Sequence, residues 1–284
     1  MSQRDGSPLV SAEWLKAHID APDLRVIEAT WFPPWTHEPG AARTAYETGH
    51  IPGAVFFDID EIADPDAPLA HTLPDTVVFS ARIRKLGLGD GNRLIVYDRN
   101  GFCASARAWW MLRTMGHTDV RVLNGGYAAW QAVGGESEDM PPQPVERHFT
   151  PRMRGDLVRT LPQMESLVEA GGPATILDAR PAGRFAGEAP EPREGLASGH
   201  IPTSRNLPAS SLVTEAGFMK PAEALQPVFD GVTGPVVTTC GSGVSACILA
   251  LALAEAGHED VAVYDGSWSE WAEGGIRPIE TGPA

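Results

Sequence analysis

The stretch MGHTDVRVLNGGYAAW, residues 115–130, returns later in the chain as AGHEDVAVYDGSWSEW, residues 256–271. Each copy has a Gly-His pair at its second and third positions, continues with a short apolar run typical of a buried strand, and ends in a segment of small and aromatic residues. Agreement over the whole stretch rarely arises by chance. It indicates that the chain contains two copies of one structural unit.

Further motifs repeat in the same order in both halves. The matching segments are VIEATW from Val26 with ILDAR from Ile176, YETGHIPGAVFFDID from Tyr46 with LASGHIPTSRNLPAS from Leu196, and RLIVYD ending at Asp98 with PVVTTC ending at Cys240. The spacing to the next match is 26 residues from Asp98 to Asn124 and 25 residues from Cys240 to Asp265. Order and spacing therefore both support a tandem repeat.

Each half alternates short β-rich runs with helical stretches, which predicts an α/β fold with a mainly parallel sheet flanked by helices. We expect strands near Val26, Val55, Leu94, Val120, Thr175, Asn206, Val236 and Val261, and helices over 11–20, 105–116, 161–171 and 245–257. Ser11 and Thr160 suit helix N-caps, and Gly116 and Gly257 suit helix ends. The proline-rich segment 137–155 predicts a linker between domains at 8–136 and 156–279.

Composition excludes several classes of function. The net charge of -15 over 284 residues would repel nucleic acid and anionic membranes. No secretion signal opens the chain, and the apolar run 247–254 is too short to span a bilayer, so we expect a cytoplasmic protein. Three cysteines without a Cys-x2-Cys pair predict neither a disulfide framework nor a metal site.

The stretch TTCGSGVSA, residues 238–246, carries the most chemistry. Cys240 ends an expected strand, and a helix begins near Ser245. Gly241 and Gly243 allow backbone conformations in which consecutive amides point at one atom. The helix start favours a thiolate, so we interpret Cys240 as a nucleophile, against the alternative of a buried structural cysteine.

Two other loops of this kind are alternatives. A cysteine phosphatase needs an arginine six residues after its nucleophile, where this chain has Ala246. GSGVSA also satisfies the dinucleotide-binding pattern G-x-G-x-x-A after a strand. The matching segment of the first half, RNGFCASAR, does not carry that pattern, so we disfavour a dinucleotide site without excluding it.

CGSGVSA resembles the active-site loop of the mercaptopyruvate sulfurtransferases of the two-domain rhodanese superfamily. The resemblance covers nearly the whole chain through GHIPGAVFFDID, HTLP, RAWWML, GRFAGEAPEPREG, SGHIP and YDGSWSEW. It implies two tandem rhodanese-like domains, of which the first is catalytically inactive because Asp98 stands where Cys240 stands in the second. A carboxylate cannot carry a transferable sulfur.

The resemblance also implies a reaction without a cofactor. Sulfur from the small-molecule substrate 3-mercaptopyruvate forms a persulfide on Cys240 with release of pyruvate, and a thiol, a thioredoxin-like protein or cyanide then accepts it. By the same resemblance, Arg184 and Arg193 bind the substrate carboxylate. The remaining residues expected to bind the substrate belong to the loop: Gly241, Gly243, Val244 and Ser245.

Protonation of the pyruvate enolate is attributed in this family to a relay of serine, histidine and aspartate, which here match Ser242, His71 and Asp60. Simpler roles compete with these. Asp60 could cap a helix and His71 could line a surface. Each arginine could pair with a glutamate of its own loop, at 188, 191 or 194.

Two other functions remain open. In the thiosulfate sulfurtransferases of this superfamily the loop resembles CRKGVT, which has two cations after the cysteine. This chain has the neutral Gly241 and Ser242 at those positions, so we expect it to prefer mercaptopyruvate, which carries one negative charge fewer than thiosulfate. A non-catalytic persulfide carrier is the second alternative. His50 and His200 recur in GHIP of both halves and are expected to be structural, and Cys247 is expected to be buried.

Overall fold

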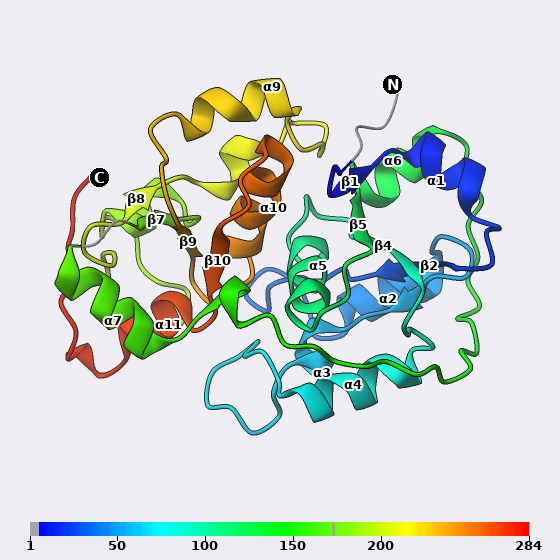
Figure 1. The fold of residues 1–284 in the computed structure, drawn as a ribbon, viewed down its shortest axis with the longest axis horizontal. Helices are drawn as coiled ribbons and strands as arrows, with labels where there is room; N and C mark the ends of the chain where they lie inside the picture. The colour runs from blue at the N-terminus through cyan, green and yellow to red at the C-terminus, as the bar shows by residue number, and fades with distance from the viewer. Residues whose placement is uncertain (1–5, 172–173, 284) are drawn as a thin grey trace. The chain divides into compact units, whose positions relative to one another are not determined.

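The computed structural model describes residues 6–171 and 174–283, which form two compact units (Figure 1). The first unit contains the chain up to Pro65, Leu73–Arg154 and the short segment Glu215–Met219. The second contains Asp66–Thr72, Gly155–Thr214 and the chain from Lys220 onward. Each unit thus includes one short segment that is remote from its other residues in sequence.

The first unit is built on a five-stranded parallel sheet with the order β1-β5-β4-β2-β3. Its inner strands are continuous apolar runs such as Leu94–Tyr97, as expected for a parallel sheet covered on both faces. The elements are β1 (Leu9–Val10), α1 (Ala12–His18), β2 (Leu24–Glu28), α2 (Ala41–Thr48), β3 (Val55–Phe56), α3 (Ile59–Ile62), α4 (Thr76–Lys85), β4 (Arg93–Tyr97), α5 (Ser105–Thr114), β5 (Val120–Leu123) and α6 (Gly126–Ala132).

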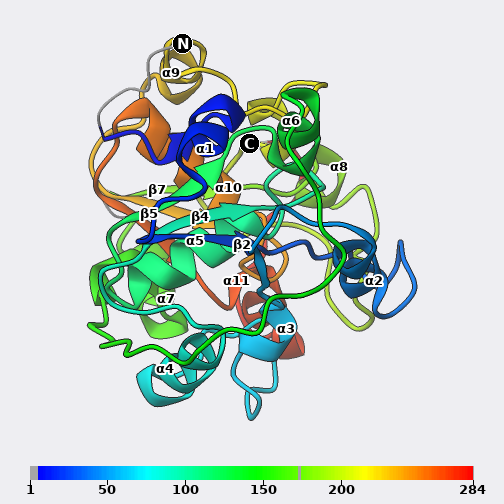
Figure 2. The same cartoon turned by 90° about the vertical axis from the view of Figure 1, so that its right-hand side faces the viewer.

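Helices cover both faces of this sheet. Ile95 and Tyr97 of β4 pack into one core cluster with Leu15 of α1 and Trp130 of α6. Because side chains alternate along a strand, the neighbouring residues of β4 point to the opposite face, where α5 packs on β4 and β5. Figure 2 shows α5 lying along β4 and β5.

The second unit repeats the plan, with the sheet order β6-β10-β9-β7-β8 and all neighbours parallel. This order becomes that of the first sheet when the strands are matched in chain order within each unit. The elements are η1 (Gly155–Leu157), β6 (Val158–Arg159), α7 (Leu161–Ala170), β7 (Thr175–Asp178), α8 (Ala182–Phe185), β8 (Arg205–Asn206), η2 (Ala209–Leu212), α9 (Ala222–Leu225), η3 (Gln226–Phe229), β9 (Val236–Thr239), α10 (Ala246–Ala256), β10 (Val261–Tyr264), α11 (Ser267–Trp271) and η4 (Glu273–Gly275).

The layers of the second unit match those of the first. Met164 of α7 and two tryptophans of α11, Trp268 and Trp271, share a core cluster with Ile176 and Val237 of the sheet. α10 packs against β9 and β10 (Figure 1), and it is buried nearly all round, in keeping with its apolar sequence. In the described part of the chain, no helix is long and apolar enough to cross a bilayer.

The expected fold class, the eight expected strands and the four expected helices are all confirmed. Ser11 caps α1, where its Oγ accepts the N–H of Trp14 at 3.2 Å. Gly116 and Gly257 end their helices with φ of +93° and +96°. The sequence analysis did not predict the two-residue edge strands β1 and β6.

The repeated histidines have a structural role, as expected. His50 is fully buried, donates from Nδ1 to the carbonyl of Tyr46 at 2.9 Å and stacks on that ring. His200 does the same with the carbonyl and ring of Phe185. Their backbones pair with those of Glu138 and Glu280, so each histidine holds the chain segment that follows its repeat.

The proline-rich segment runs along the first unit. It has no helix and only the single bridge of Glu138 before η1 begins at Gly155. Two contacts hold it there. The N–H of Arg152 donates to the carbonyl of Met115, just after α5, at 2.8 Å, and the buried ring of Phe149 packs on Phe79 of α4. The domain boundaries given above remain a prediction.

One buried imidazole in this unit makes stability depend on pH. Burial lowers the pKa of His117, although its Nε2 contacts the carbonyl of Asn92 at 2.9 Å, which opposes the shift. In the unfolded chain the pKa is about 6.5, so below that pH the unfolded state binds a proton that the folded state resists. We expect the free energy of unfolding to fall as pH drops from about 7 through this range.

The variant His117→Gln should weaken that pH dependence. Urea unfolding at a series of pH values between 7 and 5 measures the slope. His37→Gln, which removes an exposed imidazole, is the matched control and should keep the wild-type slope. Equal slopes for all three proteins would contradict the assignment.

Candidate active site

The loop 240–245 joins β9 to α10, so Cys240 lies at the carboxyl end of a central strand. This edge of a parallel sheet is where α/β proteins bind their ligands. Cys240 is 2 % exposed and Ser242 is 8 % exposed. Gly243 has a φ of +75°, a conformation that favours glycine. The prediction that the thiol ends a strand just before a helix is therefore confirmed.

Two serines of α11 fix the loop, and the sequence analysis missed both. The N–H of Cys240 donates to Oγ of Ser267 at 3.2 Å. The carbonyl of Gly241 accepts from Oγ and N–H of Ser269 at 2.6 and 2.9 Å. A signal was available, because the matching residues of the first half are Gly126 and Ala128. The hydroxyls thus occur only in the half that carries Cys240.

The two predicted substrate-binding arginines do lie against this loop. Nη2 of Arg193 donates to Oγ of Ser242 at 3.0 Å. A Cβ placed on Gly241 would lie 3.2 Å from Nη2 of Arg184 and 3.4 Å from Nη1 of Arg193. Gly241 is not in the left-handed region, which corrects our expectation for it. Its importance is that it leaves room for two guanidinium groups.

Arg184 also pairs with a glutamate of its own loop, one of the alternatives considered above. Its Nε lies 3.2 Å from Oε1 of Glu191, and its Nη2 donates to Oε2 of the same carboxylate. The Glu191 side chain is 2 % exposed, whereas Glu188 and Glu194 are exposed. The pair is therefore part of the interior of the site, while Arg184 itself remains 20 % exposed.

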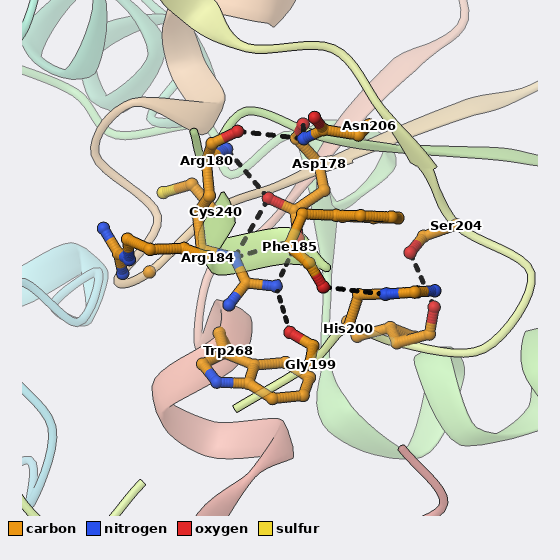
Figure 3. Close-up of polar contacts among 12 residues, drawn as sticks. Asp178, Arg180, Arg184, Phe185, Gly199, His200, Ser204, Asn206, Cys240 and Trp268 are labelled. Carbon is orange, nitrogen blue, oxygen red and sulfur yellow. Dashed lines mark hydrogen bonds and ion pairs between the residues drawn. The ribbon is translucent and has the colours of Figure 1, made fainter. Parts of the chain in front are cut away.

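A second guanidinium, that of Arg180, also binds the Glu191 carboxylate. Nη1 of Arg180 donates to Oε1 of Glu191 at 2.8 Å, while Nε and Nη2 donate to Asp178 at the end of β7. Burial alone would lower the pKa of Arg180, but the carboxylates of Asp178 and Glu191 raise it above its ordinary value. Figure 3 shows Arg180 between Asp178, the carbonyl of Gly199 and the ring of Trp268.

Electrostatics link the second arginine to the thiol. Burial lowers the pKa of the Arg193 guanidinium below its ordinary value, and the positive charge of Arg184 acts in the same direction. A negative charge on Cys240 opposes this shift. Arg193 is thus a partly desolvated cation that attracts an anion at the position of the sulfur.

The matching loop of the first unit shows what this kind of loop can enclose. The Asp98 carboxylate accepts the backbone N–H groups of Asn100, Phe102, Ala104 and Ser105 at 2.9 to 3.2 Å. Burial raises the pKa of Asp98, and the amide hydrogen bonds oppose that shift. In this unit the strand-to-helix loop therefore forms a ring of amide donors around a buried acidic side chain.

The remaining predicted residues are divided between the units. Val244 is 4 % exposed, and Ser245 takes the N-cap position of α10. His71 belongs to the segment included in the second unit and has a φ of +66°, which is strained for a non-glycine residue. Asp60 belongs to the first unit, where it accepts the indole N–H of Trp31 at 2.9 Å.

Two smaller expectations can also be judged. Asp60 is not a helix cap, because the cap of α3 is Asp58, whose side chain accepts the N–H of Asp60. Cys247 is buried as expected, and its Sγ contacts the carbonyl of Gly243 at 3.2 Å.

Comparison with known proteins gives the family. Residues 11–133 and 160–274 each match the rhodanese-like domain. The chain is 40% identical over 275 residues to the 3-mercaptopyruvate sulfurtransferase of Escherichia coli K12, covering 95% of this chain and 97% of that protein. It is 41% identical over 281 residues to the thiosulfate sulfurtransferase of Gallus gallus, covering 95% of both.

A solved structure agrees with this result. The crystal structure of a 3-mercaptopyruvate sulfurtransferase from Escherichia coli superposes with a TM-score of 0.83 at 38% identity, covering 92% of this chain and 99% of that one. Both kinds of sulfurtransferase are thus similar to this chain at about the same identity. The chain belongs to the two-domain rhodanese-like sulfurtransferases of the 3-mercaptopyruvate and thiosulfate sulfurtransferase family.

Proposed function

We propose that the protein transfers sulfur from 3-mercaptopyruvate to an acceptor through a persulfide on Cys240. The observation that carries the proposal is the placement of Arg184 and Arg193 against the loop that contains this thiol. Two guanidinium groups beside one sulfur suit a substrate whose carboxylate must be held while its sulfur is attacked. Relatives of both substrate classes are similar to the chain, so the choice of substrate depends on the site.

The proposed first half-reaction exchanges one bond for another. The Cys240 thiolate attacks the substrate sulfur, an S–S bond forms and the C–S bond of the substrate breaks. The electron pair of that bond goes to carbon and gives the enolate of pyruvate. The proton of the new persulfide goes to this enolate, and pyruvate leaves with the outer sulfur remaining as an anion on Cys240.

Amide donors of the loop would stabilise that anion. In the first unit four amides surround the Asp98 carboxylate, and the second unit has a loop of the same kind around residues 240–246. Gly241, Gly243, Val244 and Ser245 supply its backbone. Preorganised N–H groups of this kind stabilise developing charge without reorganisation during the reaction.

Ser242 is the proposed proton carrier, since Arg193 already fixes its hydroxyl at 3.0 Å. By family resemblance, His71 and Asp60 complete the relay. The strained backbone of His71 supports a functional role, because strain of this kind concentrates at functional sites.

Charge favours 3-mercaptopyruvate over thiosulfate. Three guanidinium groups, Arg180, Arg184 and Arg193, face two carboxylates, Asp178 and Glu191, which leaves an excess of one positive charge. An ionised Cys240 would cancel this excess. A dianion such as thiosulfate would then enter with two uncompensated charges, whereas 3-mercaptopyruvate brings a single carboxylate.

We further propose that the first domain is catalytically inactive, because the Asp98 carboxylate occupies the position of the nucleophile and cannot carry a sulfur. The acceptor in the second half-reaction is a thiol, a thioredoxin-like protein or cyanide. Each can attack the outer sulfur of a persulfide and restore the Cys240 thiolate.

Replacement of the nucleophile tests the reaction. We expect Cys240→Ser to abolish pyruvate release, while wild-type protein incubated with 3-mercaptopyruvate gains the mass of one sulfur on the peptide that contains Cys240. Cys103→Ser and Cys247→Ser are matched controls and should retain activity. Mass spectrometry of the digested protein and a pyruvate assay provide the measurements. Pyruvate release by the Cys240→Ser variant would refute the assignment.

A panel of sulfur donors tests the substrate. We expect kcat/KM to be higher for 3-mercaptopyruvate than for thiosulfate. Arg184→Ala and Arg193→Ala should each raise KM for 3-mercaptopyruvate about 10- to 100-fold, because a hydrogen bond to a charged group contributes about 1.5–3 kcal/mol. A strong preference for thiosulfate would favour the thiosulfate sulfurtransferase alternative. An unchanged KM in both variants would favour a persulfide carrier.

A further inference from the structure

Both units hold one guanidinium in the same structural position, partly buried in the first unit and fully buried in the second. In the first unit Arg99 donates to Glu28 at the end of β2 and to the carbonyl of Gly49, and it lies 3.9 Å from the centroid of the Tyr127 ring. In the second unit the matching residues are Asp178, the carbonyl of Gly199 and Trp268, and they surround Arg180.

The two guanidinium groups come from different places in the chain. Arg99 follows Asp98, so it matches Gly241, whereas the residue that matches Arg180 is Thr30. Thr30 instead donates from Oγ1 to Glu28 at 2.8 Å. In the second unit the structural cation therefore comes from the segment after β7, and the loop position next to the nucleophile is left to glycine.

In the second unit, Arg180 is connected through Glu191 to Arg184, the proposed substrate-binding arginine. Arg180 uses Nε and Nη2 for Asp178 and Gly199, and its Nη1 reaches Glu191. Glu191 then holds Arg184, whose guanidinium packs on the space left open at Gly241. The contacts run without a break from the end of β7 to the loop of the nucleophile.

We infer that Glu191 is a positioning residue that fixes the Arg184 guanidinium for the substrate carboxylate, with Arg180 as its anchor. The inference rests on the proposed function. Glu191 is too deeply buried to meet substrate itself, and both of its carboxylate oxygens are occupied by guanidinium groups. Its effect on the reaction passes through Arg184.

The physical basis is the cost of ordering an arginine side chain. A free arginine loses about 2 kcal/mol of rotamer entropy when it is held in one conformation. Because Glu191 already holds Arg184 in one conformation before substrate arrives, less side-chain entropy is lost when the substrate binds. Without its negative charge, Arg180 and Arg184 would repel each other, and the partly exposed Arg184 would turn toward solvent.

The test is the variant Glu191→Gln, with Glu194→Gln as the matched control on an exposed side chain of the same loop. For Glu191→Gln we expect KM for 3-mercaptopyruvate to rise about tenfold or more, as for other residues that orient a binding group, with kcat changed much less. Loading of Cys240 by inorganic polysulfide, which has no carboxylate to be held, should be no slower than in the wild type, because the variant removes a negative charge that would repel this anion. Glu194→Gln should match the wild type in both assays.

A double-variant cycle separates positioning from a general structural effect. In the Arg184→Ala background, Glu191→Gln should raise KM no further, because the group that it positions is already missing. A full additional increase in that background, or slower loading by polysulfide in Glu191→Gln, would overturn the inference.

Thermal melting of each variant and a milder substitution serve as controls for misfolding. Glu191→Asp keeps the charge but is one methylene shorter, so it should give a KM between those of the wild type and Glu191→Gln. Failure of the proposed function would appear as a wild type that releases no pyruvate. Failure of the inference would appear as an active wild type whose KM is matched by Glu191→Gln.

Discussion

Each unit depends on a carboxylate that is buried at the end of one strand and on the guanidinium that pairs with it. The carboxylate of Glu28 or Asp178 ends a central strand, and one guanidinium joins it to a glycine carbonyl and an aromatic ring. Loss of one partner from such a pair typically costs about 3–5 kcal/mol, because the other charge stays buried and unpaired. The guanidinium thereby joins the end of the strand to the loop that contains the glycine and to the helix that carries the aromatic ring.

The loop after the neighbouring strand of the sheet, β4 in the first unit and β9 in the second, differs between the two halves. In the first half the loop amides donate to the Asp98 carboxylate, whereas in the second half the loop carries the Cys240 thiol and two serines of α11 hold its backbone. The same strand-to-helix loop thus carries a carboxylate in one unit and a thiol in the other, so one fold can present different chemistry at one position.

Periodicity and internal repetition were enough to predict the fold class, the main strands and the position of Cys240. The arginines beside it came from family resemblance. The role of Glu191 could not be predicted, since three glutamates of one loop look alike in sequence and only burial separates them. The serines of α11 were missed because their partners lie 27 and 28 residues away in the chain. Asp60 was an acceptable cap by type, but Asp58 has the backbone geometry.

The two origins of the buried guanidinium limit how the halves could exchange parts. If the second half received the first loop, DRNGFC, in place of CGSGVS, it would gain an arginine at the position of Gly241. That arginine would compete with Arg180 for Asp178. The reverse graft would leave Glu28 facing Thr30 without a cation. Divergence after duplication therefore required paired replacements at two distant positions, and any recombinant of the halves must transfer both together.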